Sequence, residues 1–237
     1  MGHNNYFQFK QFRIVQEKAA MKVGIDGVLL GAWANVDVCT QILDVGTGTG
    51  LIALMMAQRS AAEITAIEIE ENAATEAREN VMASPWENRV HVKYVSFQDF
   101  AKENSAKFDL IVSNPPFFER SQKSTNANRT VARHNDSLPF QDLISHAVGL
   151  LNEKGRLAVI LPVEPAQHFI EIAKSHQLNL SRLTKVSPDE RKEPHRYLME
   201  FSAGNSFESD NLAIRSYHQN DYSLQYKTLC KDFYLLF

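Results

Sequence analysis

Apolar and polar residues follow two different periods along this chain, and their alternation predicts most of its elements. Between residues 42 and 176, short runs rich in β-branched residues are separated by longer amphipathic stretches. The runs predict strands at 42–45, 63–69, 90–95, 108–113 and 156–161, and the stretches predict helices that begin at 51 or span 73–82, 138–151 and 164–176. Such alternation is typical of a parallel sheet with helices on both faces. The carboxyl ends of its strands share one edge, where sheets of this class bind ligands.

The pattern changes after residue 178. Two apolar runs at 178–186 and 197–201 predict an antiparallel pair joined by a charged loop, 212–216 predicts a further edge strand, and 222–234 predicts a closing helix. We therefore expect one α/β domain over residues 1–237. It would comprise an N-terminal extension at 1–41, a cofactor-binding core at 42–177, and antiparallel strands with a helix at 178–237.

Composition narrows the class of protein. With 237 residues, 44% hydrophobic and 22% charged, the chain can bury a core of its own. Two distant cysteines and eight histidines show no metal-ligand spacing, so we expect neither a metal site nor a disulfide scaffold. No run approaches the roughly 20 apolar residues that cross a bilayer, and the N-terminus lacks a signal sequence. These features predict a soluble, cytoplasmic protein, which we expect to be a monomer.

Charge is unevenly distributed along the chain, although the net charge is only −3. Four cations stand against one acid in residues 1–22 and again in 119–134, and five stand against three in 182–197. A negative body with a positive working face would suit a polyanionic partner, because local potential steers association. Solvated loops without a partner would carry the same charges.

Glycines alternate in the loop that follows the first predicted strand. Gly46, Gly48 and Gly50 permit positive φ and close approach of the backbone to a ligand, at the start of a helix. A phosphate-binding loop would end in Gly-Lys-Ser/Thr, and a dinucleotide fold prefers G-x-G-x-x-G; neither spacing is present. Asp44, two residues before the first glycine, would repel a pyrophosphate but attract a cation. The loop therefore favours S-adenosylmethionine, which carries an ammonium and a sulfonium but no phosphate.

Two more acids follow the next two strands. Glu68 ends the second strand, 18 residues after Gly50, where a carboxylate can accept hydrogen bonds from both ribose hydroxyls. Asp99 follows the third strand and could contact the adenine amino group of the cofactor. Three acids at three successive strand ends strengthen the cofactor interpretation, because a glycine loop alone is a weak signal.

The fourth strand runs directly into Asn114-Pro115-Pro116-Phe117. An exocyclic amine is a poor nucleophile because its lone pair is delocalised into the ring. The Asn114 side-chain oxygen and the Pro115 carbonyl could accept its two hydrogens and draw the nitrogen towards tetrahedral geometry. The prolines stiffen the loop and add no competing N–H donor, and Phe117 offers a face for base stacking. An ordinary Asn-Pro turn is the structural alternative.

The glycine loop with Glu68 resembles the cofactor half of class I methyltransferases. That resemblance implies a seven-stranded, mostly parallel Rossmann-like sheet with an antiparallel C-terminal strand. The tetrad is similar to that of amino-methyltransferases acting on adenine N6, guanine N2 or protein glutamine, and these three acceptors stay open on the motifs alone. Glutamine enzymes usually have a larger helical domain before the sheet, whereas about 40 residues precede it here.

Over nearly its whole length the chain resembles one family, the bacterial tRNA1(Val) adenine-N6 methyltransferases. The most specific portions are Phe9-Lys10-Gln11-Phe12 and residues 20–33, joined by shorter stretches such as Ala132-Arg133-His134. The resemblance implies methylation of adenine 37 beside the valine anticodon. Best-known members have tyrosines after Asn-Pro-Pro, where this chain has Phe117-Phe118, so stacking is preserved but a tyrosine hydroxyl is not.

These patterns define three groups of candidate residues. The catalytic candidates are Asn114, Pro115, Pro116 and Phe117. The cofactor-binding candidates are Lys22, Gly24, Asp26, Asp44, Gly46, Thr47, Gly48, Gly50, Glu68, Ile69, Asp99 and Asn114. The candidates for binding the tRNA anticodon stem-loop are Arg120, Lys123, Arg129, Arg133, His134, Arg191, Lys192 and Arg196. Loop bases can be splayed out more cheaply than paired ones. A ribosomal guanine-N2 methyltransferase, a protein glutamine methyltransferase and a non-catalytic RNA-binding module are the alternatives.

Overall fold

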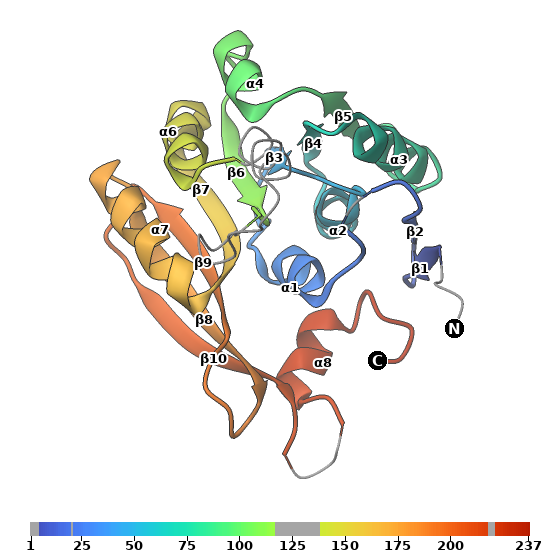
Figure 1. Cartoon of the computed structure of the whole chain (residues 1–237), viewed down its shortest axis with the longest axis vertical. Coiled ribbons are helices and arrows are strands. Elements are labelled where there is room, and N and C mark those ends of the chain that lie inside the picture. The colour runs from blue at the N-terminus through green and yellow to red at the C-terminus, as the bar shows by residue number, and fades with distance from the viewer. Residues whose placement is uncertain (1–4, 20, 117–137, 218–220) are drawn as a thin grey trace, which may run out of the picture.

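The computed structural model in Figure 1 describes residues 5–19, 21–116, 138–217 and 221–237. Its centre is a sheet in which eight strands lie in the order β10-β8-β9-β7-β6-β3-β4-β5. The strands of this sheet are β3 (Gln41–Val45), β4 (Glu63–Glu68), β5 (Val90–Tyr94), β6 (Phe108–Ser113), β7 (Leu151–Pro162), β8 (Asn179–Asp189), β9 (Arg196–Ser202) and β10 (Glu208–Arg215). A separate hairpin consists of β1 (Tyr6–Gln8) and β2 (Arg13–Val15).

Strands β3 to β7 are parallel to one another, as the alternating pattern predicts. Strand β9 is inserted between β7 and β8 and is antiparallel to both. The edge strand predicted at 212–216 is confirmed as β10, which pairs in parallel with β8 from Glu208 to Arg215 and is one strand more than the seven that the resemblance implies. Its first four residues are exposed and polar, so only 212–214 carry an apolar signal in the sequence.

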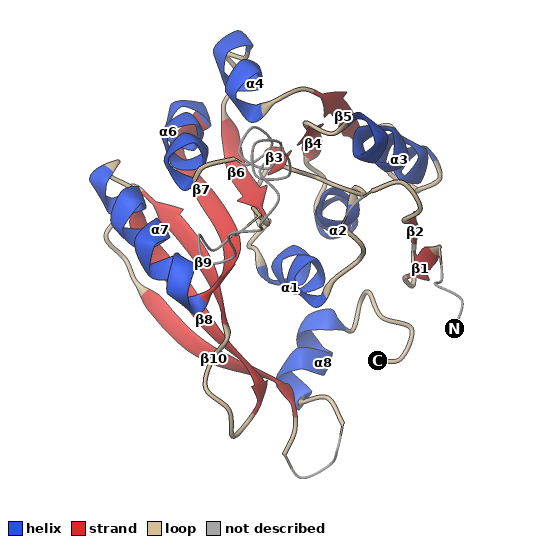
Figure 2. Cartoon of the chain, in the orientation of Figure 1, coloured by secondary structure: helices blue, strands red, loops and turns tan. Residues whose placement is uncertain are grey.

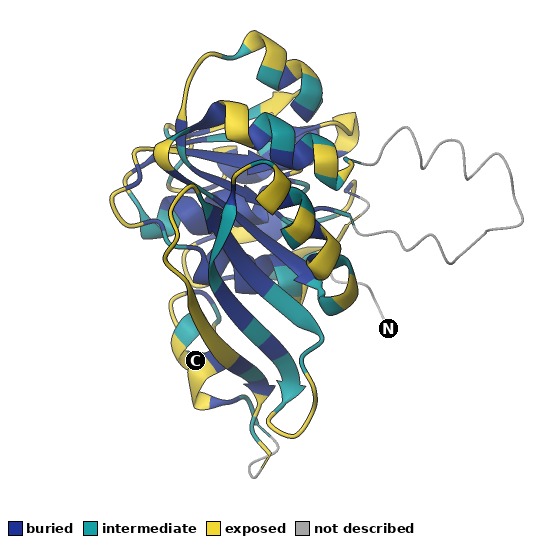
Figure 3. Ribbon diagram, turned by 90° about the vertical axis from the view of Figure 1, so that its left-hand side faces the viewer, coloured by how far each residue is buried: buried dark blue, intermediate teal, exposed yellow. Residues whose placement is uncertain are grey.

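Helices cover both faces of the sheet (Figure 2). They are α1 (Ile25–Trp33), α2 (Leu51–Arg59), α3 (Glu71–Met82), α4 (Phe97–Glu103), α6 (Phe140–Leu150), α7 (Val163–Ser175) and α8 (Leu224–Cys230). Neighbouring strand residues point to opposite faces, so Ile42 joins the core under α1 and α2, whereas Leu43 joins the core under α4, α6 and α7. The buried strands between these two cores are visible in Figure 3. The closing helix is shorter than the predicted 222–234, and Ser223 caps its start.

The two ends of the described chain meet: Figure 1 shows the β1–β2 hairpin, next to α3, close to the residues that follow α8. Phe9 is buried, and its ring packs against Phe7, Phe12 and Tyr234. The Lys10 backbone N–H donates to the Phe233 carbonyl at 2.8 Å, so the N-terminal hairpin and the C-terminal residues pack as one unit. Within the described ranges, no helix has the length and apolar character to cross a bilayer.

Candidate functional site

The carboxyl ends of β3 and β6 are adjacent, and each is followed by a sequence motif. Val45, at the end of β3, pairs with Ser113 at the end of β6. The buried Ser113 hydroxyl donates a hydrogen bond to the Val45 carbonyl at 2.9 Å. The glycine loop and Asn114 therefore leave the sheet side by side, as the parallel arrangement requires.

The glycine loop has the backbone geometry that its sequence predicts. Gly46, Gly48 and Gly50 have φ values of +74°, +56° and +84°, in a region that residues with a side chain rarely adopt. The N–H groups of Gly46 and Thr47 both donate to the Ile67 carbonyl at 3.0 Å, which fixes the loop to the end of β4. A Cβ placed on Gly46 or Gly48 would meet no atom within 4 Å, so the loop borders open space.

Asp44 is buried beneath this loop with 0% exposure. Its Oδ2 accepts hydrogen bonds from the Thr47 hydroxyl at 2.6 Å and from the Ala53 N–H at 3.2 Å. Its buried Oδ1 has no hydrogen-bond partner among the described residues. Burial raises the pKa of Asp44 to about 7, against an ordinary value of 3.8. A cationic ligand above the loop would compensate that burial.

Glu68 reaches the same loop from the end of β4. Its Oε2 accepts a hydrogen bond from the Gly48 N–H at 2.8 Å, and its Oε1 accepts from Ile69 and Glu70 at 2.9 and 3.0 Å. Asp44 and Glu68 therefore belong to one site, on either side of the glycines. Ile69, the next cofactor candidate, exposes an apolar side chain beside Glu68.

Asp99 differs from these two acids because it is engaged by its own helix. It lies in the first turn of α4, where its carboxylate accepts from the Ser96 hydroxyl at 2.7 Å and pairs with Lys102 at 3.0 Å. The hydrogen bond from Ser96 and the charge of Lys102 lower the pKa of Asp99. Its side chain is 59% exposed. Contact of Asp99 with the adenine of a cofactor stays a prediction.

The Asn-Pro-Pro segment continues from β6 without regular secondary structure. Asn114 and Pro116 are half-buried, and Pro115 is buried. Because β6 ends beside β3, the segment leaves the sheet next to the glycine loop. The remaining residues of this region, namely Phe117, Arg120, Lys123, Arg129, Arg133 and His134, lie outside the described residues.

The N-terminal candidates lie immediately before and within α1. The Lys22 ammonium donates to the Gln16 carbonyl, and the Val23 N–H donates to the Gln16 side chain at 2.8 Å. Gly24 is the N-cap of α1. Asp26, in the first turn, forms an ion pair with Arg196 at 2.9 Å, so a cofactor candidate and an RNA candidate contact each other.

The charged loop after β8 holds the other two described RNA candidates. Arg191 and Lys192 lie 3.9 and 3.6 Å from the Asp189 carboxylate, and their N–H groups and charges lower the pKa of Asp189. The Arg191 guanidinium also stacks 3.7 Å from the centre of the Tyr217 ring. Both cations have largely exposed side chains, so a polyanion can reach them.

Sequence reasoning missed two buried polar residues of α3 that bear on the site. The Asn80 amide donates to the Thr49 carbonyl of the glycine loop at 2.9 Å, and Glu76 lies four residues earlier on the same face. The sequence offered one indication of them: both are polar residues, four positions apart, on a helix face otherwise formed by small apolar residues. Their backbone partners, more than 30 residues away, leave no pattern in the sequence.

The arrangement suits a ligand that is positively charged and carries hydroxyl groups. An unpartnered buried carboxylate oxygen lies below the glycines, a second carboxylate borders them, and open space lies above them. The chemistry of these donors and acceptors fits the ammonium and ribose of S-adenosylmethionine and disfavours phosphate. Asn114 then lies where a methyl acceptor could meet that ligand.

Comparison with known proteins agrees with this geometry. The methyltransferase small domain family matches residues 28–176. The chain is 45% identical over 234 residues to the tRNA1(Val) (adenine(37)-N6)-methyltransferase of Parabacteroides distasonis, and 48% identical over 234 residues to that of Trichodesmium erythraeum, with 98% of each chain covered in both cases. A solved structure described as a predicted O-methyltransferase from Agrobacterium tumefaciens shares the fold, with a TM-score of 0.70 at 18% identity over 88% of this chain and 96% of that one. The resemblance expected from the sequence is confirmed, and the chain belongs to the tRNA1(Val) (adenine(37)-N6)-methyltransferase family.

Proposed function

We propose that this protein transfers a methyl group from S-adenosylmethionine to N6 of adenine 37 in tRNA1(Val). Two relatives that are 45 and 48% identical to this chain are named for this activity. The observation that carries the proposal is the joining of the two motifs. Ser113 bonds β6 to β3, so Asn114 and the glycine loop emerge from adjacent strands.

Asn114 and Pro115 prepare the acceptor amine in this proposal. The Asn114 side-chain oxygen and the Pro115 carbonyl each accept a hydrogen bond from the N6 amino group. These two hydrogen bonds localise the nitrogen lone pair for attack. The two prolines hold these acceptors in place without offering an N–H donor. Phe117 stacks on the base, a contact worth about 1–3 kcal/mol on comparable platforms.

The cofactor residues act by charge and position. S-adenosylmethionine supplies an electrophilic methyl group on a sulfonium when it is bound. From beneath the loop, Asp44 attracts the positive charge of the cofactor above it. Glu68 accepts hydrogen bonds from the ribose hydroxyls, and Lys22 pairs with the cofactor carboxylate. Much of the rate comes from alignment of amine and methyl group, because aligned reactants avoid a large entropic cost.

We assign tRNA contacts to the basic segments. The segment 119–134 directly follows the tetrad, and the loop with Arg191 and Lys192 lies beyond the same edge of the sheet. Phosphate contacts fix the register of the RNA, whereas the site around Asn114 selects the extruded base. A cytoplasmic location and a monomeric state accompany this proposal as expectations.

The direct test is methylation of unmodified total tRNA by the purified protein, followed by nucleoside analysis. We expect N6-methyladenosine at position 37 of tRNA1(Val), and far less of it with Asn114→Ala. N2-methylguanosine, or methyl incorporation into protein glutamine, would replace the proposed acceptor with one of the other two. A protein that binds tRNA without any methyl incorporation would instead be an RNA-binding module.

A further inference from the structure

Helix α3 carries two buried polar side chains that are not among the candidate cofactor or RNA residues. Glu76 is 0% exposed and Asn80 is 2% exposed, and their spacing of four residues places them on one face of the helix. Buried carboxylate and amide groups are costly unless they are hydrogen-bonded. Their partners therefore show what this face of α3 holds.

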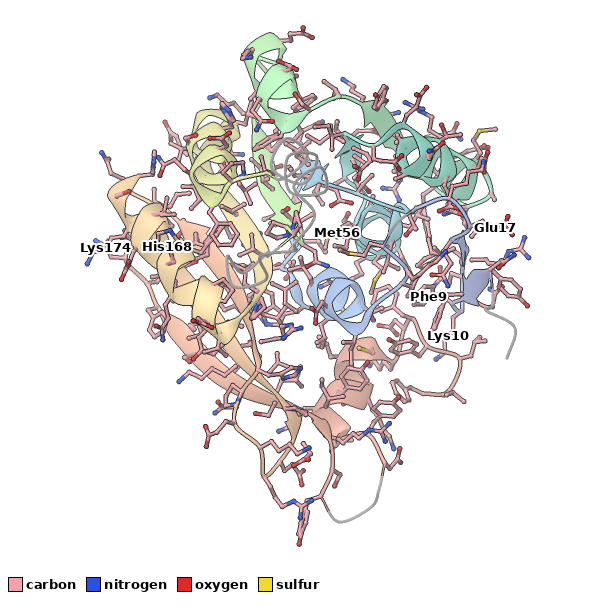
Figure 4. All side chains as sticks on the ribbon, viewed as in Figure 1. Phe9, Lys10, Glu17, Met56, His168 and Lys174 are labelled. Carbon is pink, nitrogen blue, oxygen red and sulfur yellow. The ribbon has the colours of Figure 1, made fainter. Side chains whose placement is uncertain are left out.

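Glu76 binds three consecutive backbone N–H groups of the N-terminal segment. Its Oε1 accepts from Glu17 and Lys18 at 2.5 and 2.7 Å, and its Oε2 accepts from Ala19 at 2.9 Å. Hydrogen bonds to an ionised acceptor are stronger than neutral ones. Glu76 thus fixes the strap, which we define as residues 15–19, against α3 near the labelled Glu17 in Figure 4.

Asn80 joins this strap to the glycine loop. Its Oδ1 accepts from the Val15 N–H at 2.8 Å, and its Nδ2 donates to the Val15 carbonyl at 2.9 Å. The same Nδ2 donates to the Thr49 carbonyl at 2.9 Å. One amide therefore bonds the strap on one side and the cofactor loop on the other.

The strap in turn holds the residues that lead into α1. Gln16 lies between Val15, which Asn80 binds, and Glu17, which Glu76 binds. The Gln16 side chain accepts from the Val23 N–H at 2.8 Å, and its carbonyl accepts from the Lys22 ammonium. The hydrogen bonds of Asn80 and Gln16, joined by the peptide bond between Val15 and Gln16, therefore connect Thr49 to Lys22.

We propose that Asn80 and Glu76 are positioning residues for the cofactor: they hold the glycine loop and the strap in one fixed relation. This inference rests on the proposed function, because it concerns affinity for S-adenosylmethionine. A site held in its binding geometry pays less ordering entropy when the ligand arrives. Loss of either residue therefore weakens cofactor binding although neither residue touches the cofactor.

The test compares Asn80→Ala and Glu76→Gln with a matched control, Asp109→Asn. The Asp109 carboxylate also holds backbone N–H groups, those of Thr40 and Gln41 at 2.7 and 3.0 Å, but at the amino end of β3. We expect the Kd for S-adenosylmethionine by calorimetry, and its KM, to rise about tenfold in the α3 variants. The kcat at saturating cofactor should stay within about twofold in those variants, because the reacting groups are unchanged. The control should keep wild-type Kd and KM at a similar loss of stability in urea.

A second variant covers the case in which Asn80→Ala does not fold. Gln16→Ala removes the hydrogen bond from the Val23 N–H at a partly exposed position, and it should raise the cofactor KM in the same direction. Wild-type cofactor affinity in folded Asn80→Ala, or equal weakening in Asp109→Asn, overturns the positioning role. Absence of S-adenosylmethionine binding by the wild-type protein would instead overturn the proposed function itself.

Discussion

Adjacent residues at the end of β6 have separate tasks, set by their side chains. The Ser113 hydroxyl bonds to the Val45 carbonyl and joins two strands, whereas Asn114 follows the last residue of β6 and is half-buried. Pro115 contributes a carbonyl but no donor. Removal of the Asn114 amide therefore affects the acceptor and leaves the strand pairing intact.

Asn114→Ala should lose most of its turnover while it still binds the cofactor. One of the two groups that prepare the amine is removed, and loss of one preorganised hydrogen-bonding group elsewhere costs roughly 10²–10³ in kcat. Single-turnover methylation and calorimetric titration with S-adenosylmethionine measure the two effects separately. Turnover at the wild-type rate would disprove the role of the tetrad.

Asp44 makes both stability and cofactor affinity depend on pH. Burial raises its pKa to about 7, so the folded protein holds a proton that the unfolded chain releases near 3.8. The stability that this proton contributes is full below the unfolded pKa and is lost as pH rises through 7. Ionised Asp44 attracts the positively charged cofactor. The affinity for the cofactor therefore rises with pH, whereas the stability falls.

We therefore expect the cofactor to bind roughly tenfold more weakly at pH 6 than at pH 8, because about a tenth of Asp44 is ionised one unit below its pKa. Asp44→Asn should bind weakly and lack this component of the pH dependence. Any pH dependence of Kd that remains in this variant includes the titration of the ligand itself and can be subtracted. Identical pH profiles of Kd in the two proteins would assign the dependence to another group.

Much of the site could be predicted from residue types with few possible conformations. Glycines at positive φ and acids at strand ends follow from local geometry. The glycine loop therefore has the predicted backbone conformation, and Glu68 lies beside it at the end of β4. Asp99 is held by Ser96 and Lys102, a local competition that strand-end reasoning does not consider. Asn80 was missed because its partners come from two distant segments.

At the scale of elements, α1 and α2 pack closely enough to position the loop between β3 and α2. A Cβ on Gly31 of α1 would lie 2.6 Å from the Met55 sulfur and 3.1 Å from the Met55 Cβ. A Cβ on Gly27 would lie 3.1 Å from Leu51, the first residue of α2. Small residues one turn apart therefore allow α1 to approach the helix that begins at the glycine loop.

Gly31→Ala should lower the free energy of unfolding by about 1–3 kcal/mol, because the added methyl group overpacks a buried contact. The gain in helix propensity, about 1 kcal/mol, offsets part of the cost. Gly149→Ala in α6 is the matched control, since its Cβ would meet no atom within 4 Å. Urea unfolding should show destabilisation in the first variant and none in the second; equal stability would contradict the packing argument.

Element boundaries could be predicted where burial gives a strong apolar signal. Strands β3, β4 and β6 have the expected positions, since most of their residues are buried. Strand β7 begins at Leu151, five residues before its predicted start, because its first residues include Glu153 and Lys154 at exposed positions. Strands β1 and β2 have three residues each, too few for a periodic pattern.

At the scale of the whole molecule, the two chain ends stabilise each other. Phe9 and Lys10 are labelled in Figure 4. The Lys10 ammonium donates to the Lys231 carbonyl and to the main-chain oxygen of Phe237 at 2.6 Å each, and the buried ring of Phe9 lies against Tyr234. These contacts close the aromatic cluster from which the N-terminal strand leads towards the strap. Local stability there can therefore influence the site.

Removal of residues 233–237 should destabilise the protein by about 2–5 kcal/mol, because it strips the buried Phe233 and partly uncovers Phe9. Lys10→Met removes only the two hydrogen bonds of an exposed side chain and should cost less than about 1 kcal/mol. Thermal unfolding of both variants measures the difference. Similar melting temperatures for the truncated and full chains would show that the ends do not depend on each other.

The distribution of charge decides how a protein of net charge −3 could grip a polyanion. Arg129→Glu with Arg133→Glu should weaken tRNA binding and flatten its dependence on salt, because each lost phosphate contact removes about 0.7–0.9 from the slope of log K against log salt. Lys154→Glu with Lys174→Glu makes the same change in net charge near the start of β7 and the end of α7, by the amino-terminal edge of the sheet. That control should retain the wild-type slope, since the proposed RNA surface lies beyond the opposite edge. Equal slopes for both double variants, measured by filter binding across a salt series, would show that net charge and not the basic segment governs association.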